Sequence, residues 1–264
     1  MTDTYLTYDE LHTLLAGVLQ AGGYNPAHAA AIAHTMSKAE RDQCRSLWPE
    51  VEALANQGLG ALAMCPSNAY VAPAGGIRKL FGTNPLAFGW PTGDDCPYVF
   101  DFATSVIARG EVELYRLDNK PLPDGWGIDR DGQPSRDAAA VLDGGALLPF
   151  GGYKGSAIAT MIELLAAVWI GDLLSSESSE ADGGLAPNHG TLHIALDPAA
   201  FAATDRLAHA EKLLAAIRAQ GARLPSERRY AARAAAAKEG IAISQENLDR
   251  LQRMQQGDLD LELH

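Results

Sequence analysis

The sequence predicts a mixed α/β (α+β) protein that is not a Rossmann fold. Short apolar runs of strand character alternate with segments of helical periodicity, but βαβ units at regular spacing are lacking. The G-x-G-x-x-G motif that follows the first strand of a Rossmann domain is absent. The chain has 264 residues, 47% hydrophobic and 20% charged, which suits one large folded domain or two small ones.

Two helices are expected at the start of the chain. Thr7 and Glu10 have the spacing of a capping box in front of leucines at helical spacing, and Gly22-Gly23 follows as a stop. Asn25-Pro26 combines an N-cap residue with proline at the first helical position. The second helix is therefore expected from Pro26 to about Glu40.

The middle of the chain has strand character. We expect a short helix over 51–56, strands over 59–65, 85–90 and 98–103, a helix over 104–114, and a Gly/Pro/Asp-rich loop over 121–134.

The last part is mainly helical. We expect a long helix from 151–155 to about 170, a polar loop over 175–188, a strand over 191–196, helices over 199–219, 226–238 and 244–254, and a frayed tail. Ser226 is the expected cap of its helix.

The charge and cysteine content narrow the functional class. Lys and Arg number 21 and Asp and Glu 33, a net charge of −12, which argues against a nucleic-acid or anionic-membrane partner. The first residues do not resemble a secretory signal, and the longest apolar stretch, 157–170, is too short to span a bilayer. Three widely spaced cysteines form no CxxC pair, so we expect free thiols in a cytoplasmic protein and no metal site.

Two glycine-containing turns are candidate ligand sites. Gly151-Gly-Tyr-Lys-Gly-Ser156 opens a long helix, where free N–H groups and Lys154 would suit an anion. The alternative, a glycine-rich helix entry without a ligand, is equally compatible with this pattern. The turn at Thr83-Asn84-Pro85 offers short polar side chains, although the composition favours a plain turn.

Asp101 is the third candidate because it lies between Phe100 and Phe102, where a carboxylate needs a partner. A functional Asp101 would orient a catalytic histidine or accept a hydrogen bond from a donor of the substrate. An N-cap for a helix beginning at Thr104-Ser105 explains it slightly better. The seven histidines lie in no metal-binding or catalytic motif, and G-x-S-x-G is absent.

Taken together, seven segments resemble the malate/L-lactate dehydrogenase-like oxidoreductases, and among them the Δ1-piperideine-2-carboxylate/Δ1-pyrroline-2-carboxylate reductases. The segments, in family order, are AERD (39–42), LWPEVEALANQGL (47–59), LFGTNPLAFGWP (80–91), VFDFATS (99–105), PLPDGWGID (121–129), GGALLPFGGYKGSAIATMIELLA (144–166) and PSERRY (225–230).

The resemblance implies a mainly antiparallel NAD(P)-binding sheet domain, 45–197, and a helical domain built from 1–44 and 198–264, in a homodimer. It implies hydride transfer from NADPH, or from NADH, to a C=N or C=O bond beside a carboxylate. The substrate would be a small imino acid or 2-oxo acid.

The resemblance also assigns individual residues. Those in cofactor-contacting motifs are Thr104, Ser105, Lys154, Gly155 and Glu227. Thr83 and Asn84 fall in the loop at the substrate, and Asp101 falls at the acid of a catalytic Ser-His-Asp relay.

One departure from the family concerns the proton donor. In the family, AERD precedes a Ser-His-Gly stretch that supplies the serine and histidine of the relay, whereas here Cys44-Arg45-Ser46 leads directly into the LWP segment. Several dozen family residues are absent. A catalytically impaired or repurposed relative, and a 2-oxo acid dehydrogenase, are therefore the alternatives to an imine reductase.

Overall fold

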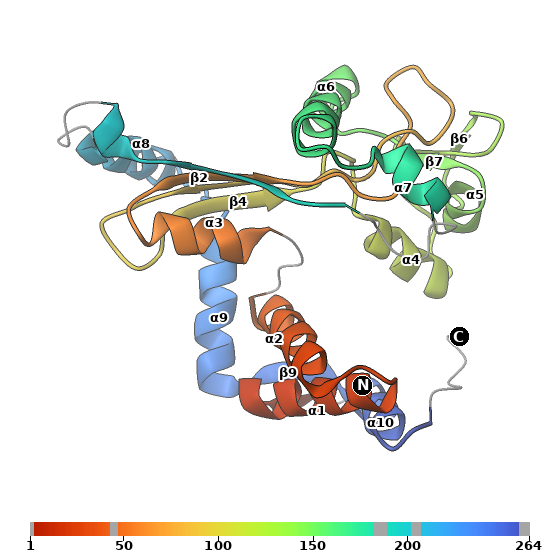
Figure 1. Cartoon of the computed structure of the whole chain (residues 1–264), viewed down its shortest axis with the longest axis horizontal. Helices are drawn as coiled ribbons and strands as arrows, with labels where there is room; N and C mark the ends of the chain where they lie inside the picture. The colour runs from red at the N-terminus through yellow and green to blue at the C-terminus, as the bar shows by residue number, and fades with distance from the viewer. Residues whose placement is uncertain (1–2, 43–46, 182–188, 202–206, 259–264) are drawn as a thin grey trace. The chain divides into compact units, whose positions relative to one another are not determined.

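The structure, a computed structural model, describes residues 3–42, 47–181, 189–201 and 207–258. It divides into two units (Figure 1). Unit 1 combines Met1–Ser46 with Asp205–His264, and unit 2 is the continuous segment Leu47–Thr204.

Unit 1 is mainly helical and is closed by a two-stranded antiparallel ribbon. Its elements are β1 (Asp3–Leu6), α1 (Tyr8–Ala21), α2 (Pro26–Asp42), α8 (Leu207–Ala219), α9 (Glu227–Glu239), β9 (Ile241–Ser244) and α10 (Gln245–Gln255). The ribbon pairs β1 with β9, from Asp3 opposite Ser244 to Leu6 opposite Ile241.

The expected capping box starts α1. The Thr7 hydroxyl accepts the Glu10 N–H at 3.2 Å, and the Glu10 carboxylate accepts the Thr7 N–H at 2.8 Å. The leucines of α1 then face inward, where Leu11 and Leu15 pack with Ala33 of α2 and Ile241 of β9. Burial of these side chains stabilises the unit.

Unit 2 is built on a four-stranded antiparallel sheet in the order β4-β3-β2-β8. The strands are β2 (Gly60–Met64), β3 (Leu86–Trp90), β4 (Tyr98–Phe102) and β8 (Leu192–Leu196).

Helices lie on both faces of this sheet (Figure 1). On one face, α3 (Trp48–Ala55) approaches so closely that a Cβ on Gly89 would lie 2.5 Å from the Val51 carbonyl. On the other, α6 (Tyr153–Glu163) packs Ile162 against Met64. A π-helical turn, Leu164–Val168, continues α6 directly.

A smaller sheet and three short helices complete unit 2. They are β5 (Gly127–Ile128), β6 (Pro134–Ser135), β7 (Ala146–Leu147), α4 (Arg109–Leu117), α5 (Ala138–Leu142) and α7 (Ser175–Ala181). The order of the small sheet is β6-β5-β7, and all its pairings are antiparallel.

The predicted fold class is confirmed, since every strand pairing within the named sheets is antiparallel and the arrangement is not a Rossmann fold. The predicted helix over 104–114 is wrong at its start. The segment 104–106 instead pairs with 148–150, so that α4 begins only at Arg109.

Two further predictions are corrected. Residues 175–181 form α7 rather than a polar loop, because the Glu177 carboxylate accepts the Leu174 N–H at 2.8 Å and Ser175 is buried. The helix expected from 199 begins as a 3-10 turn over Pro198–Ala200, and α8 begins at Leu207. Residues 182–188, 202–206 and 259–264 lie outside the described residues.

Ser226 does not cap its helix through its side chain. The Glu227 carboxylate instead reaches back from the first turn and accepts the N–H of Leu224, which lies before the helix, at 3.1 Å.

Candidate functional site

Three predicted site segments are joined by a ladder of backbone hydrogen bonds. The ladder lies at the edge of the sheet where β3 begins and β4 ends. The Thr83 carbonyl accepts the Thr104 N–H at 2.8 Å, and the Thr104 carbonyl accepts the Phe150 N–H at 3.0 Å. The Phe150 carbonyl accepts the Gly155 N–H at 2.9 Å. The structure therefore brings together the 83–84 turn, the 104–105 segment and the start of α6.

Gly155 is required by close packing at this point. A Cβ at Gly155 would lie 2.4 Å from the Phe150 carbonyl oxygen and 2.8 Å from that of Thr104. Because both atoms belong to the backbone, neither can move aside as a flexible side chain could.

Lys154 lies in the first turn of α6 with an exposed side chain. Within the part of the chain that the structure describes, its ammonium makes no hydrogen bond or ion pair. The charge is thus available to an anion.

The expectation of free N–H groups at this helix start is largely wrong. The amides of Gly152, Lys154, Gly155 and Ser156 each donate to a backbone carbonyl of the turn, at 2.9–3.3 Å. Gly151 and Gly152 have φ of +56° and +61°, which folds the turn back on itself and uses these donors. An anion here would be held mainly by the lysine side chain.

Thr83 and Asn84 differ in their availability. Thr83 is half-buried, and its hydroxyl has no hydrogen-bond partner among residues 3–42, 47–181, 189–201 and 207–258. Asn84 is fully buried, has φ of +36° and donates from Nδ2 to Glu163 at 2.8 Å. The Thr83 hydroxyl is therefore free to meet a ligand, whereas the Asn84 carboxamide is engaged within the protein.

Thr104 and Ser105 are buried, and their hydroxyl protons are used internally. The Thr104 hydroxyl donates to the Thr83 carbonyl at 3.0 Å, and Ser105 donates to the Ile107 carbonyl at 2.6 Å. Both side chains shape the turn, and their oxygens keep only acceptor capacity.

Asp101 is on the opposite face of the sheet from α6. It pairs across the sheet with Ala87, and side chains alternate between faces, so that Asp101 shares the α3 face while Phe102 shares the α6 face. One oxygen, Oδ2, is buried, as expected for a carboxylate that is not a solvated cap. The alternative, an N-cap for a helix beginning at 104–105, is wrong because no helix begins there.

Cys65 shares this environment. Burial, reinforced by the negative charges of Asp101 and Glu50, raises the pKa of the Cys65 thiol to about 12. The thiol stays neutral at physiological pH and is not a nucleophile.

An aromatic surface adjoins the ladder. Phe102 is 41% exposed, and its ring meets that of Phe150 edge-to-face at 5.7 Å between centroids. Phe102 also stacks on Phe100 at 5.0 Å. These rings provide an apolar wall beside Thr104 of the ladder.

Glu227 belongs to unit 1. Its carboxylate accepts a hydrogen bond from Arg218 at 2.6 Å, and this bond is the main cause of its lowered pKa. The Leu224 amide completes its partners.

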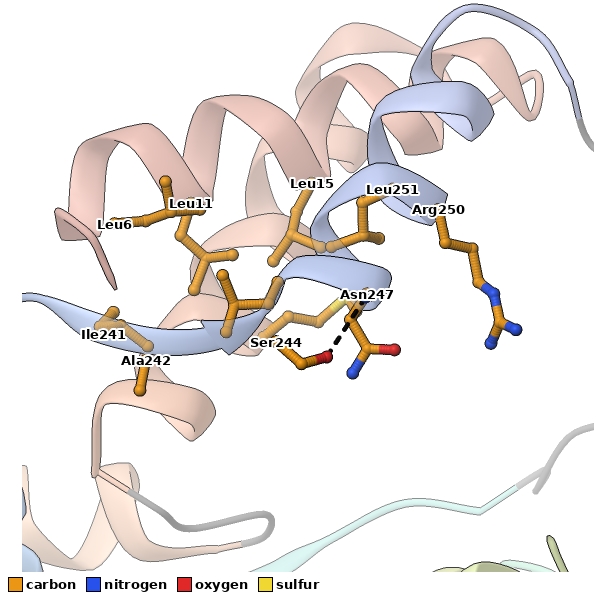
Figure 2. A pocket seen from close by; sticks show the side chains of 11 residues that line it. Leu6, Leu11, Leu15, Ile241, Ala242, Ser244, Asn247, Arg250 and Leu251 are labelled. Atoms are coloured by element: carbon orange, nitrogen blue, oxygen red, sulfur yellow. Dashed lines mark hydrogen bonds between the residues drawn. The ribbon is translucent and has the colours of Figure 1, made fainter. Parts of the chain in front are cut away.

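A separate cavity of about 630 Å³ lies in unit 1 and contains none of the predicted site residues (Figure 2). Leucines of α1 and Ile241 of β9 line it, while Ser244 and Asn247 close one side with a 3.3 Å hydrogen bond. Figure 2 shows the Arg250 side chain extending away from the leucines.

Glu163 and Ser175 adjoin the 83–84 turn, although neither is predicted as a site residue from the sequence. Glu163 is only 6% exposed, and Ser175 is fully buried. The sequence does carry one signal for Glu163. Its carboxylate lies inside the apolar stretch 157–170, and its helical spacing from the apolar residues places it on the side that faces the core.

The pattern of the malate/L-lactate dehydrogenase family matches residues 43–252. The chain belongs to this family, as the resemblance predicted, and is an oxidoreductase of the class that uses a nicotinamide cofactor.

Within this family, the chain is similar to reductases of cyclic imino acids. The chain is 50% identical to a Δ1-pyrroline-2-carboxylate reductase of Agrobacterium fabrum, over 94% of this chain and 76% of that protein. It is 37% identical to Δ1-pyrroline-2-carboxylate reductase 1 of Burkholderia ambifaria, over 95% of this chain and 97% of that protein. The crystal structure of Δ1-piperideine-2-carboxylate reductase from Pseudomonas syringae pv. tomato superposes with a TM-score of 0.87 and 33% identity, covering 95% and 99% of the two chains.

The Burkholderia alignment also contains positions that this chain lacks. It extends over 332 positions, whereas 95% of 264 residues is about 250, so about 80 positions have no counterpart here. This agrees with the family residues missing near Cys44.

Neither a membrane span nor a metal site is found in the described part of the chain. No helix there has the length and apolarity needed to cross a membrane, and no cluster of three potential ligands is present. Cys65 and Cys96 are thiols that form no disulfide within the described ranges, as expected.

Proposed function

We propose that the protein reduces a cyclic imino acid, Δ1-pyrroline-2-carboxylate or Δ1-piperideine-2-carboxylate, to the cyclic amino acid at the expense of a reduced nicotinamide cofactor. The observation that carries this proposal is the ladder that holds the free Lys154 ammonium and the free Thr83 hydroxyl on one rigid turn system. The substrate class follows from the names of the relatives, which are Δ1-pyrroline-2-carboxylate and Δ1-piperideine-2-carboxylate reductases.

Unit 2 is the proposed cofactor-binding unit. An exposed, unpaired ammonium at Lys154 beside a backbone turn suits a phosphate, so the residues present fit a dinucleotide. When bound, the cofactor supplies the hydride. Lys154 and the Thr104–Gly155 packing would hold and orient it, with Ser105 supporting the turn. The cofactor role of Glu227 stays a prediction from its motif. We favour NADPH over NADH.

The proposed substrate contacts leave a slow route without a positioned acid, through the fraction of the imine that is already protonated. A substrate carboxylate would accept a hydrogen bond from the Thr83 hydroxyl. The apolar Phe102 wall would face the ring of the substrate. A cyclic imine that is already protonated accepts a hydride at carbon and becomes a secondary amine without a further proton. The catalytic role of Asp101 stays a prediction from its motif, because its side chain shares the α3 face of the sheet, opposite the Phe102 wall.

The loss of the relay histidine sets the expected rate. A positioned acid contributes about 10²–10⁴-fold. We therefore expect NADPH-dependent reduction of Δ1-piperideine-2-carboxylate that is slower by about that factor than in the Agrobacterium relative, measured by loss of reduced-nicotinamide absorbance. The rate should fall as pH rises and the iminium loses its proton.

The Lys154 assignment is tested by Lys154→Ala. We expect NADPH binding to weaken by roughly 1.5–3 kcal/mol, the contribution of a charge-assisted hydrogen bond, in a fluorescence titration. Lys120→Ala is the control, because Lys120 is exposed and already paired with Asp118 at 2.7 Å. An unchanged NADPH dissociation constant in Lys154→Ala would remove the observation on which the proposal stands.

A second candidate function is supported by the roughly 80 missing positions: a relative that binds the cofactor and substrate but has lost turnover or been repurposed. Titration with NADPH and with NADH, followed by assays with the cyclic imines and with pyruvate, separates an imine reductase, a 2-oxo acid dehydrogenase and a binding protein. Homodimer formation and a cytoplasmic location also remain proposals, and light scattering on the purified chain tests the first.

A further inference from the structure

Glu163 is a buried carboxylate that the proposed chemistry does not use. It is 6% exposed at the end of α6, beside Ile162 and Ala166 of the cluster that packs on the sheet. A charge in such surroundings persists only when hydrogen bonds compensate its lost hydration.

Three donors converge on Glu163. Asn84 Nδ2 lies 2.8 Å from Oε1, the Ser175 hydroxyl lies 2.5 Å from the same oxygen, and the Ser175 N–H lies 3.0 Å from Oε2. They come from the turn before β3 and from the first residue of α7, so one carboxylate joins α6 to two other segments.

Asn84 is held in an unusual conformation by this contact. Its φ of +36° lies in the left-handed region, which asparagine tolerates better than most residues. Its second amide proton reaches the Ala159 carbonyl at 3.4 Å, and its oxygen lies 3.3 Å from the Ser175 hydroxyl, whose single proton is directed to the nearer Glu163. Every polar atom of the Asn84 side chain therefore faces protein.

The turn held by Asn84 carries Thr83. The Thr83 N–H donates to Ser67 at 3.1 Å, and the Thr83 carbonyl is the first acceptor of the ladder. The position of the free Thr83 hydroxyl thus depends on the conformation of its neighbour Asn84.

The helix itself changes at Glu163. The π turn Leu164–Val168 follows at once. Such turns are rare and are frequent at functional sites. The buried carboxylate, the left-handed asparagine and the π turn meet at a single point.

We infer that Glu163 is a positioning residue for the reaction, which fixes Asn84 in its left-handed conformation and so aims Thr83 at the substrate. Asn84 acts through the backbone and not as a substrate ligand. This inference rests on the proposed function. It assigns substrate affinity, rather than cofactor affinity, to the Glu163–Asn84–Ser175 cluster.

The first test is Glu163→Gln. The single carbonyl oxygen of glutamine can replace only one of the two carboxylate oxygens, so either the Ser175 N–H or the Asn84 and Ser175 side chains lose their acceptor, with nearly unchanged volume. Because a misplacement of about 1 Å can cost about 10²-fold, we expect the substrate KM to rise about 10- to 100-fold. The NADPH dissociation constant should change less than about 3-fold, since Lys154 and its turn are untouched.

The swapped pair Glu163→Gln/Asn84→Asp gives the decisive comparison. The amide now placed at position 163 can donate to the carboxylate now placed at position 84, which restores the polarity of the contact and keeps one negative charge. We expect the substrate KM to return to within about 5-fold of wild type. Failure of this rescue in a folded double variant would overturn the inference.

Two serines of α7 supply a matched control. Ser178 is 1% exposed and donates to Asn68 at 2.9 Å, whereas Ser175 belongs to the cluster. Ser175→Ala and Ser178→Ala should lower the melting temperature similarly, but only Ser175→Ala should raise the KM. Equal KM values in the two variants would show a structural role alone.

Binding of pyrrole-2-carboxylate, a planar non-reducible analogue, to the NADPH-loaded protein separates the two hypotheses. If the wild-type chain does not turn over but its analogue affinity follows the predicted pattern, the proposed function fails and the inference stands. If Glu163→Gln behaves as wild type, the inference fails alone. If the wild-type chain binds no analogue, both fail.

Discussion

Gly155→Ala should destabilise unit 2 although alanine is the better helix former. The new Cβ would lie 2.4 Å from the Phe150 carbonyl oxygen and 2.8 Å from that of Thr104, so the ladder must open. Overpacking costs about 1–3 kcal/mol, and a lost ladder hydrogen bond adds about 0.5–1.5 kcal/mol. The helix propensity of alanine returns about 1 kcal/mol. The net expected loss is about 0.5–3.5 kcal/mol.

Urea denaturation, monitored by circular dichroism, measures this loss of stability. NADPH binding, measured by titration, should weaken in parallel. Gly110→Ala is the matched control, because Gly110 lies in the first turn of α4 with nothing within 4 Å of an added Cβ. Its expected effect is zero or a gain of up to about 1 kcal/mol. A Gly155→Ala protein as stable as Gly110→Ala would refute the close-packing argument.

Two further predictions concern ionisation. Hydrogen bonds from the Thr7 backbone and then its side chain lower the pKa of Glu10 below 4.5, so the stability that Glu10 gives is present above that pH and is lost as pH falls through the folded pKa. Urea melts of Glu10→Gln and wild type should therefore differ at neutral pH and converge in acid, once the pH lies below the folded pKa. Burial raises the pKa of Cys65 from 9.0 to about 12, so its contribution to stability holds below pH 9 and is lost as pH rises from there toward 12. Maleimide labelling with peptide mapping should modify the exposed Cys96 and spare Cys65 in the native protein, and labelling of both at equal rates would contradict the burial.

Local signals predicted much of the fold. The capping box at Thr7, the Asn25-Pro26 start and the apolar strands all rest on neighbouring residues, and all are present in the structure. The β1–β9 ribbon escaped prediction because its partners are far apart in sequence and each strand has only four residues. α7 escaped because its serines are stabilised by tertiary contacts rather than by helix propensity.

The site was only partly predictable for the same reason. The Lys154 turn and the 83–84 turn carry glycine, proline and charge in recognisable order, yet the sequence says nothing of the ladder that joins them. Free amides at the helix start were expected, but the left-handed glycines consume them. Glu163 looked like an interruption of an apolar helix, since its donors come from segments that are distant in sequence.

The β1–β9 ribbon has a consequence for synthesis and for evolution of the chain. Unit 1 cannot assemble until residues 241–244 have left the ribosome, whereas unit 2 is continuous and can fold as it emerges. Everything between the two strands is one loop of about 230 residues whose closure entropy grows only with the logarithm of its length. Adding the roughly 80 positions of the Burkholderia relative would raise that cost by only about 0.3 kcal/mol. A large block can therefore be gained or lost inside this loop while β1 and β9 still pair.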